Sequence, residues 1–245
     1  MLKSILILSL FFSTSSFSNS VFDREENLNG IQLKSGKSHA VRTFIAATET
    51  RFQYPLELIK KGITNFTEKC NNSLKNKRKF TSRQYECKYH NENLIETFVV
   101  ENIRPMEDFK RFQDVYLLGR QVYNRGIFGY YEMVTVTESV DEKKQKVVVI
   151  KLRMLDDKEV GYLITPKFSR ESAFDKSTSI FTLTAVTPEE THVKYEYRAE
   201  TDHWLLNKEI SVPQVFASIG KSMTELIKTV DTESGRQKRE LASKE

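Results

Sequence analysis

The sequence predicts an α+β fold with a curved antiparallel β-sheet followed by one long C-terminal helix. Residues 192–200 alternate between apolar and polar side chains, the pattern of a strand with one buried face. Strand-like segments joined by short polar turns occupy most of residues 84–187, which favours a meander of antiparallel strands. Apolar residues then recur every three or four positions over residues 212–230, the spacing of an amphipathic helix.

The first twenty residues have the composition of a secretory signal peptide. Lys3 precedes an apolar run from Ile5 to Phe12, and a serine-rich segment follows up to Ser20. The apolar run is shorter than the ~20 residues that span a bilayer, so we expect cleavage, after Ser18 or Ser20, rather than a membrane anchor. The sequence therefore predicts an extracytoplasmic protein, periplasmic or secreted, with no transmembrane segment after signal cleavage.

Composition and charge are those of an ordinary globular protein. The chain is 39% hydrophobic and 29% charged, with a net charge of +5. Lysines and arginines are interleaved with acidic residues along most of the chain, which indicates a solvated surface rather than a nucleic-acid groove. We expect a monomer that does not bind nucleic acid.

The two cysteines, Cys70 and Cys87, are predicted to form a disulfide because the protein is expected in an oxidising compartment. In the chain-entropy model such a bond stabilises the fold by about 3 kcal/mol. Two buried free thiols are the alternative. The histidines are scattered, without the spacing of zinc ligands, so we expect no metal site and no cofactor; they are His39, His90, His192 and His203.

A polar lead-in is expected over residues 21–38, before the folded domain begins at residue 39. The first elements of that domain are a strand at residues 40–47 and a helix that starts at Pro55. Proline suits the first turn of a helix because it has no N–H group to leave unpaired. The helix is supported by apolar residues at helical spacing, namely Leu56, Ile59, Ile63 and Phe66.

Strands follow through the middle of the chain, interrupted by one short helical turn at residues 105–112. They are expected at residues 84–90, 94–103, 115–123, 127–139, 146–155, 159–164, 179–187 and 192–200. The last of these strands places apolar side chains on its buried face: Val193, Tyr195, Tyr197 and Ala199.

The last element is the amphipathic helix. Ser211 is its predicted N-cap, and Pro213 belongs to its first turn. Gly235 is predicted to end it. The folded domain is expected to cover residues 39–231, followed by a charged, flexible tail over residues 232–245.

This order of elements resembles the START-like (SRPBCC) helix-grip superfamily, which includes lipid-transfer START domains, polyketide cyclases and pollen-allergen-like proteins. The resemblance covers residues 39–231. It rests most on the strand Val193–Ala199, the bulky segment His203-Trp204-Leu205-Leu206 and the proline-marked helix start Val212-Pro213. It implies that the curved antiparallel sheet grips the last helix, with a cavity between them. A lipocalin or another up-and-down barrel is the structural alternative, against which the early helix and the long last helix argue.

If the sheet grips the last helix, side chains of both line a pocket that suits an apolar ligand with a polar end. The candidates on the strands are Phe128, Tyr130, Tyr131, Met133, Tyr195 and Tyr197. Those on the helix are Phe216, Ile219 and Met223, with Trp204 at the pocket mouth. The alternative for each of these side chains is that it only fills the core.

The chain contains no Gly-x-Ser-x-Gly, P-loop or dinucleotide-binding motif. We therefore expect a non-enzymatic, exported, soluble protein that carries a lipid or other hydrophobic small molecule in an internal cavity. One alternative is a cyclase- or hydratase-type enzyme that uses polar groups in the same cavity. The other is a non-catalytic module that docks an envelope component and has a solid interior.

Overall fold

The computed structural model describes residues 22–64, 88–90, 95–100, 107–122, 129–166, 170 and 172–243. The expected signal peptide, residues 1–20, lies outside the described residues, and so do Cys70 and Cys87.

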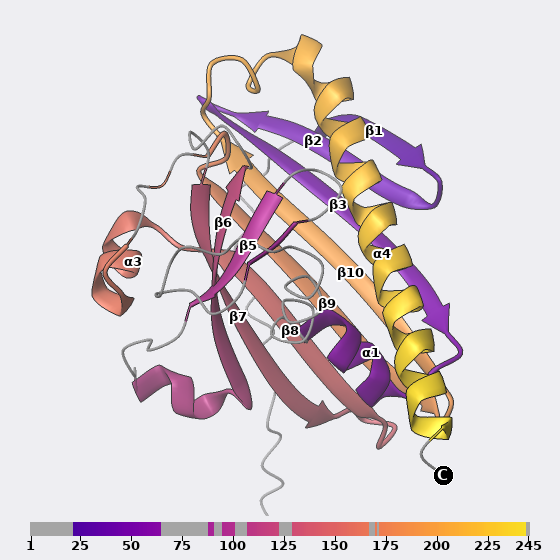
Figure 1. Cartoon of the computed structure of the whole chain (residues 1–245). Coiled ribbons are helices and arrows are strands. Elements are labelled where there is room, and N and C mark those ends of the chain that lie inside the picture. The colour runs from indigo at the N-terminus through magenta and orange to yellow at the C-terminus, as the bar shows by residue number, and fades with distance from the viewer. Residues whose placement is uncertain are drawn as a thin grey trace, which may run out of the picture.

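The described part of the chain is built on a ten-stranded antiparallel sheet with the order β1-β2-β3-β10-β9-β8-β7-β6-β5-β4 (Figure 1). The strands are β1 (Phe22–Leu28), β2 (Ile31–Ser38), β3 (Val41–Phe52), β4 (Lys88–His90), β5 (Ile95–Val100), β6 (Asp114–Val122), β7 (Gly129–Val140), β8 (Lys146–Met154), β9 (Lys176–Thr187) and β10 (Glu190–Thr201). Pairing of β3 with β10 joins the first three strands to the remaining seven.

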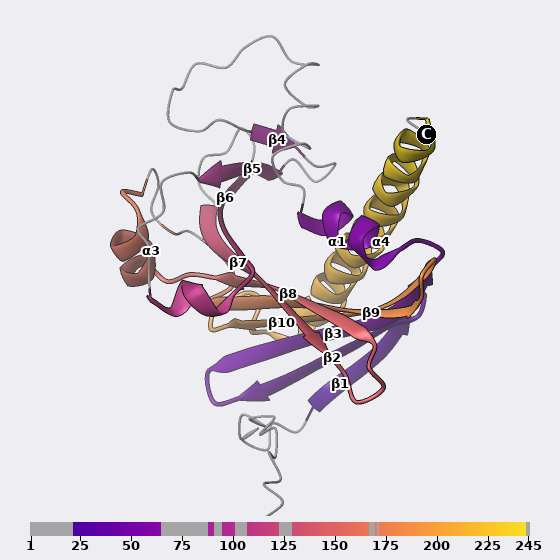
Figure 2. The same ribbon diagram turned by 90° about the horizontal axis from the view of Figure 1, so that it is seen from below.

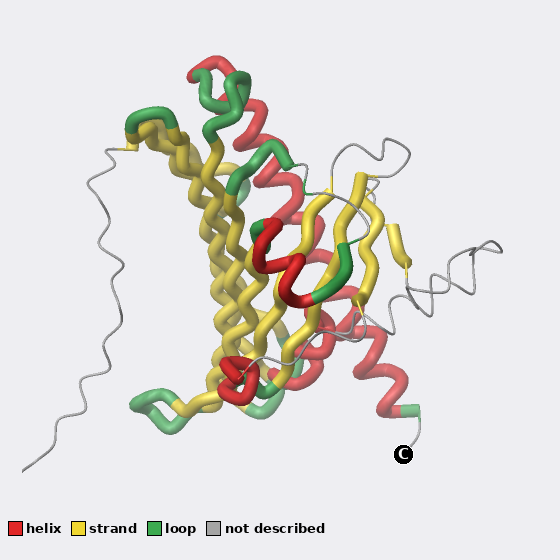
Figure 3. The backbone as a smooth tube through the Cα atoms, turned by 90° about the vertical axis from the view of Figure 1, so that its left-hand side faces the viewer, coloured by secondary structure: helices red, strands yellow, loops and turns green. Residues whose placement is uncertain are grey.

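The sheet bends around α4 (Val212–Ala242), which crosses its concave face beside α1 (Leu56–Thr64) (Figures 1 and 2). The main hydrophobic core fills the space between this face and the two helices. A smaller core lies on the opposite, convex face, under α3 (Asp157–Leu163). Figure 3 shows the sheet from the side on which α3 lies. The predicted arrangement of a curved sheet around a long C-terminal helix is therefore confirmed.

Most of the predicted elements are present, with ends that differ by a few residues. The early helix is α1, the helical turn is η1 (Glu107–Arg111), and the strand at residues 192–200 is β10. The predicted strands at 84–90 and 94–103 fall only in part within the described residues, as β4 and β5.

The prediction of a loose lead-in over residues 21–38 is wrong, because β1 and β2 form a hairpin there. Asn29 and Gly30 make the turn with φ of 54° and 82°. A type I′ hairpin turn needs positive φ at both central residues, and Asn-Gly is among the pairs that adopt it most readily. Ile31 and Leu33 then point into the main core.

Arg42 joins this hairpin to the rest of the fold. Its guanidinium is 2% exposed and donates to both carboxylate oxygens of Asp23, at 3.1 and 3.0 Å, and to Ser35 Oγ at 2.9 Å. It also donates to the Asn207 carbonyl and to Glu209 Oε2, both at 3.3 Å. One buried cation thus links β1, β2 and β3 to the connection between β10 and α4.

The predicted strand at residues 159–164 is wrong, since this segment forms α3. Asp156 caps the helix by accepting from the Glu159 N–H at 2.8 Å, while Glu159 accepts from the Asp156 N–H at 3.1 Å. This reciprocal capping box satisfies two N–H groups that a helix start leaves unpaired. Arg153 adds a two-pronged ion pair with Glu159, at 2.9 and 2.7 Å.

The prediction that the helix ends at Gly235 before a flexible tail is also wrong, because α4 continues to Ala242. A Cβ at Gly235 would lie 2.9 Å from the Tyr54 hydroxyl, so glycine here permits close packing instead of ending the helix. Next to it, the buried Ser234 donates to the Leu58 carbonyl of α1 at 3.3 Å. The predicted helix start is confirmed: Ser211 is the N-cap residue and Pro213 lies in the first turn.

One ion-pair cluster makes stability depend on acid pH. Glu138 accepts from Lys60 at 2.8 Å and contacts Lys146 at 3.0 Å, and these two bonds lower the pKa of Glu138 to about 2. Because this pKa is below the unfolded value of 4.5, the stabilisation is complete above pH 4.5 and is lost as the pH falls towards 2.

We therefore expect Glu138→Gln to cost up to about 1 kcal/mol at pH 7, because ion pairs near the surface contribute little. The cost should be much smaller at pH 2, where about half of the folded protein has lost the charge of Glu138. Urea unfolding of both proteins across this pH range measures the difference. A difference that stays constant between pH 7 and pH 2 contradicts the prediction.

Candidate functional site

The candidate site is the concave face of the sheet beneath α4. Side chains alternate between the two faces of a strand, and in β7 the even-numbered Val134 and Val136 lie in the main core under α4. Tyr130 and Glu132 share that parity and therefore the concave face. In β10, Tyr195 and Tyr197 lie on the same face.

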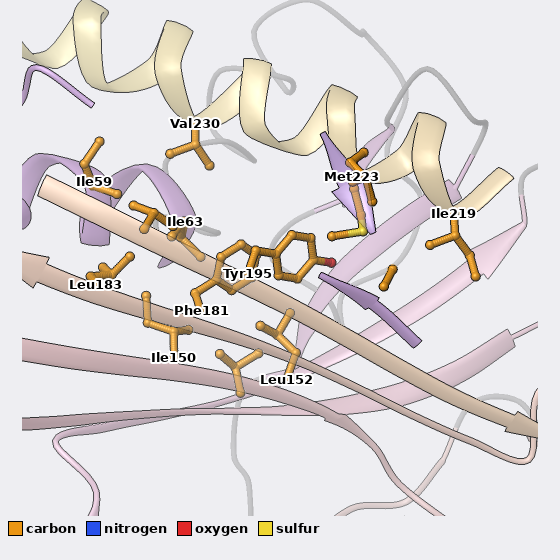
Figure 4. Close-up of a cluster of buried hydrophobic side chains, with 14 of the residues drawn as sticks. Ile59, Ile63, Ile150, Leu152, Phe181, Leu183, Tyr195, Ile219, Met223 and Val230 are labelled. Atoms are coloured by element: carbon orange, nitrogen blue, oxygen red, sulfur yellow. The ribbon is translucent and has the colours of Figure 1, made fainter. Parts of the chain in front are cut away.

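Most of this face is apolar. Figure 4 shows the Tyr195 ring between the sheet and α4, among aliphatic side chains of both. It stacks on Phe181 with the ring centroids 4.2 Å apart. Further along α4, Phe216 packs edge-on against Phe44 at 6.2 Å. Ile219 and Met223 continue the apolar surface of α4 over the sheet.

A charged pair interrupts the apolar face. Arg120 of β6 donates to Glu132 of β7 at 2.5 Å, and their side chains are 17% and 11% exposed. The neighbours of Glu132 across the strands are Leu118 of β6 and Met154 of β8, both buried. An ion pair set among apolar side chains offers both a donor and an acceptor to the polar end of an apolar molecule.

Tyrosine hydroxyls extend this polar region. Burial raises the pKa of Tyr195 to about 12, although the hydrogen bond with Ser179 Oγ, at 3.3 Å, opposes the shift. Burial also raises the pKa of Tyr197, and the neighbouring Tyr130 adds to the effect. Tyr195 and Tyr197 therefore stay neutral near pH 7 and act as hydrogen-bonding groups without charge. Glu132 contributes to raising both pKa values, which places the ion pair close to them.

Side chains of the main core occupy the space between α4, α1 and the strands that they cover, in the part of the chain that the structure describes. Among the described residues, a hollow of about 10 Å³ lies between β3, β9, β10, α1 and α4. It is lined by Thr48, Thr50, Phe52, Ile63, Phe181, Val193, Tyr195, Ile227 and Val230. A volume of this size holds about one water molecule. A larger ligand on these residues would require α4 or α1 to move away from the sheet.

The structure brings most of the predicted pocket residues together. Tyr195, Tyr197, Phe216, Ile219 and Met223 meet in the main core between the sheet and α4. Tyr130 shares the concave face. Phe128 lies outside the described residues.

Three of the predicted pocket residues lie elsewhere. Tyr131 and Met133 are on the convex face, where they pack in and against the smaller core under α3. Their parity is opposite to that of Val134, so they cannot face α4. Trp204 is 68% exposed in the connection between β10 and α4 and does not line the concave face.

The sequence reasoning missed Arg120 and Glu132. A signal for Glu132 is present, because alternation along β7 places it two residues before Val134 on the same face. The partnership with Arg120 depends on the register between β6 and β7, which pairs Arg120 with Tyr130 and Leu118 with Glu132. That register cannot be read from either strand alone.

Neither a metal centre nor a membrane-spanning helix is found in the part of the chain that the structure describes. No three metal-ligating side chains gather there. No described helix combines the length and the apolar character needed to cross a bilayer.

The strand order, with α4 held in the bend of the sheet, decides the fold. The fold is a helix grip, a curved antiparallel sheet around a long C-terminal helix. Human STARD10 is similar to this chain with a TM-score of 0.49 and 12% identity, over 90% of this chain and 77% of that one. A STAR-related lipid transfer protein from Xanthomonas axonopodis gives 0.42 and 11%, over 85% and 96%. Norcoclaurine synthase from Thalictrum flavum gives 0.41 and 9%, over 82% and 99%.

At these identities the similarity concerns the fold alone. No family model matches the sequence. The curated proteins contain no match to it either.

Proposed function

We propose that this protein binds a lipid or other hydrophobic small molecule with a polar end, between the concave face of the sheet and α4. The observation that supports the proposal most is the Arg120–Glu132 pair, set among the apolar side chains of Leu118, Val134 and Met154. A solid core gains little from such a pair, because removing two charges from water costs about as much as their attraction returns. A ligand with a polar end would form hydrogen bonds with this pair.

The proposed binding places the apolar part of the ligand against Phe181, Tyr195 and the apolar side of α4. Removing apolar surface from water contributes about 25 cal/mol per Å² to the free energy of binding. An aliphatic chain or a ring system would therefore bind here without specific contacts. The polar end of the ligand would replace its hydrogen bonds to water with hydrogen bonds to Arg120 and Glu132. Because the hollow between the sheet and the helices holds about one water, at 10 Å³, α4 would act as the gate.

We further propose that the protein works after export, as the composition of residues 1–20 suggests. A soluble carrier is needed where an apolar molecule must cross water, and an extracytoplasmic compartment is such a setting. The proposed role is therefore transport or storage of the ligand, without chemical change.

The test begins with protein purified from the extracytoplasmic fraction of expressing cells, with its N-terminus determined by mass spectrometry. Organic extracts of this protein should contain a reproducible amphiphile in amounts comparable to the protein. Recovery only from the cytoplasm, with Met1 retained, contradicts export. The absence of any extracted molecule, together with no binding of a fluorescent fatty acid, contradicts the binding function.

Two matched double variants test the role of the ion pair. Arg120→Met with Glu132→Leu removes both charges but keeps the volume, so we expect the fold to remain stable. The retained ligand should fall about tenfold or more, because hydrogen bonds to charged groups are lost. Arg51→Met with Glu190→Leu removes a second pair, 3.0 Å long, in which Arg51 is 65% exposed, and should change nothing. Equal retention by both variants would show that Arg120 and Glu132 do not hold the polar end.

A further inference from the structure

The connection between β10 and α4 lies at one end of the molecule (top of Figure 1). Four exposed apolar side chains belong to this connection and to the start of β3. Trp204 is 68%, Leu205 44% and Ile210 79% exposed, and all three belong to this connection. Val41, 37% exposed, comes from the start of β3 beside it. The two segments are in contact, because the Asn207 side-chain amide donates to the Ala40 carbonyl. We call this set of four side chains the apolar tip.

The apolar tip is held in place by the fold. The connection turns back on itself through the Asn207 N–H, which donates to the His203 carbonyl at 2.9 Å. Ser211 Oγ donates to the Leu205 carbonyl at 2.8 Å. From below, the buried Arg42 donates to the Asn207 carbonyl at 3.3 Å. Leu206, between the exposed residues, packs against the main core. The connection thus packs Leu206 against the core and leaves Trp204 and Leu205 exposed to solvent.

The charges around the apolar tip are mixed but include exposed cations on both segments. Lys208 stacks its ammonium over the Trp204 ring at 5.1 Å from the centroid. Lys37 is exposed near the end of β2, which leads into the turn before Val41. Of the two acids in the connection, Glu209 pairs with Arg42, and Asp202 is exposed. A tryptophan with aliphatic neighbours and lysines at the same level is the composition of a segment that enters the interface of a bilayer.

We propose that the apolar tip docks the protein onto a lipid bilayer surface containing anionic lipids. Single exposed apolar residues are normal on a protein surface, but four at one end of the molecule need a partner. A stable protein interface requires about 800 Å² and 20–30 residues from each partner, which four projecting side chains do not supply. A bilayer needs only a few inserted side chains, and the lysines match its anionic headgroups.

The chain offers a direct probe, because Trp204 is its single tryptophan. We expect its fluorescence to shift to shorter wavelength when vesicles of phosphatidylcholine and phosphatidylglycerol are added to the purified protein. Its quenching by aqueous acrylamide should decrease in parallel. Vesicles of phosphatidylcholine alone should bind more weakly, because they lack the negative surface potential. An unchanged emission with both vesicle types overturns the proposal.

Variants that keep Trp204 test the neighbouring side chains. Leu205→Ser with Ile210→Ser should weaken vesicle partitioning about a hundredfold, at about tenfold for each buried aliphatic side chain. Val140→Ser with Tyr162→Ser changes two residues that are 64% and 57% exposed elsewhere, and should leave partitioning unchanged. All variants share one N-terminus, so any contribution of residues 1–20 cancels. Equal loss in both variants, or none in the first, overturns the proposal.

Docking does not depend on the proposed ligand. Vesicle binding is measured on protein extracted free of small molecules, whereas ligand retention is measured without vesicles. Vesicle binding without ligand retention would contradict the proposed binding function and support the role of the apolar tip. Ligand retention without vesicle binding would contradict only the docking proposal.

Discussion

Asp23→Ala is expected to lower the free energy of unfolding by about 3 kcal/mol, although Asp23 lies in the first strand of the described chain. The reason is that the substitution leaves Arg42 without this carboxylate. Arg42 is 2% exposed and would keep Glu209, at 3.3 Å, as its one remaining ion-pair partner among the described residues. Without Asp23, the Arg42 guanidinium still carries the free-energy cost of being removed from water, but it lacks the attraction of the Asp23 carboxylate that offsets this cost.

Urea unfolding of the variant measures this loss, with Glu25→Ala as the matched control. Glu25 is the neighbouring acid on β1 and pairs with Lys34 at 3.0 Å, but both side chains are exposed. That change should cost less than about 1 kcal/mol. Combining Asp23→Ala with Arg42→Met should recover part of the stability, because the unpaired cation is then absent. Similar losses for Asp23→Ala and Glu25→Ala would show that Arg42 finds a new partner.

The hairpin that carries Asp23 shows which part of the fold was readable from sequence. The Asn29-Gly30 pair is a strong local hairpin signal, and the capping box of Asp156 and Glu159 is an equally local helix signal. Polar residues surround the Asn29-Gly30 signal and favour a loop, whereas the apolar residues that follow the capping box, up to Ile164, favour a short strand. The Asp23–Arg42 pair has no such local sign, since it joins residues 19 positions apart through the register of three strands.

The candidate site divides in the same way. On β10 only one face is apolar, so alternation correctly placed Tyr195 and Tyr197 under α4. On β7 both faces are covered, one by α4 and the other by the smaller core under α3. A strand buried on both faces loses its alternation of apolar and polar residues, which is why Tyr131 and Met133 could not be assigned to a face. The face of each residue on β7 depends on the position of α3, which the sequence pattern predicts as a strand.

Phe216→Ala is expected to destabilise the protein by about 3–5 kcal/mol, the largest loss among these variants. Phe216 is 1% exposed and lies where α4 meets the sheet. Its ring packs edge-on against Phe44, which packs in the same manner on Phe174, with 6.2 Å between centroids in each pair. Removing the ring leaves a space that this interlocked set cannot close without losing its own contacts. Leu241→Ala, on the same helix at 55% exposure, should cost less than about 0.5 kcal/mol.

The cavity left by Phe216→Ala also provides a test of where the proposed ligand binds. A ligand that binds only the folded state raises the free energy of unfolding with the logarithm of its concentration. If apolar molecules enter between the sheet and α4, a small hydrophobic ligand should restore more stability to Phe216→Ala than to the parent protein, because it fills the space without displacing the helix. Equal stabilisation of the two proteins would place the ligand elsewhere. The same denaturation series thus separates the role of Phe216 in packing from its place beside a ligand.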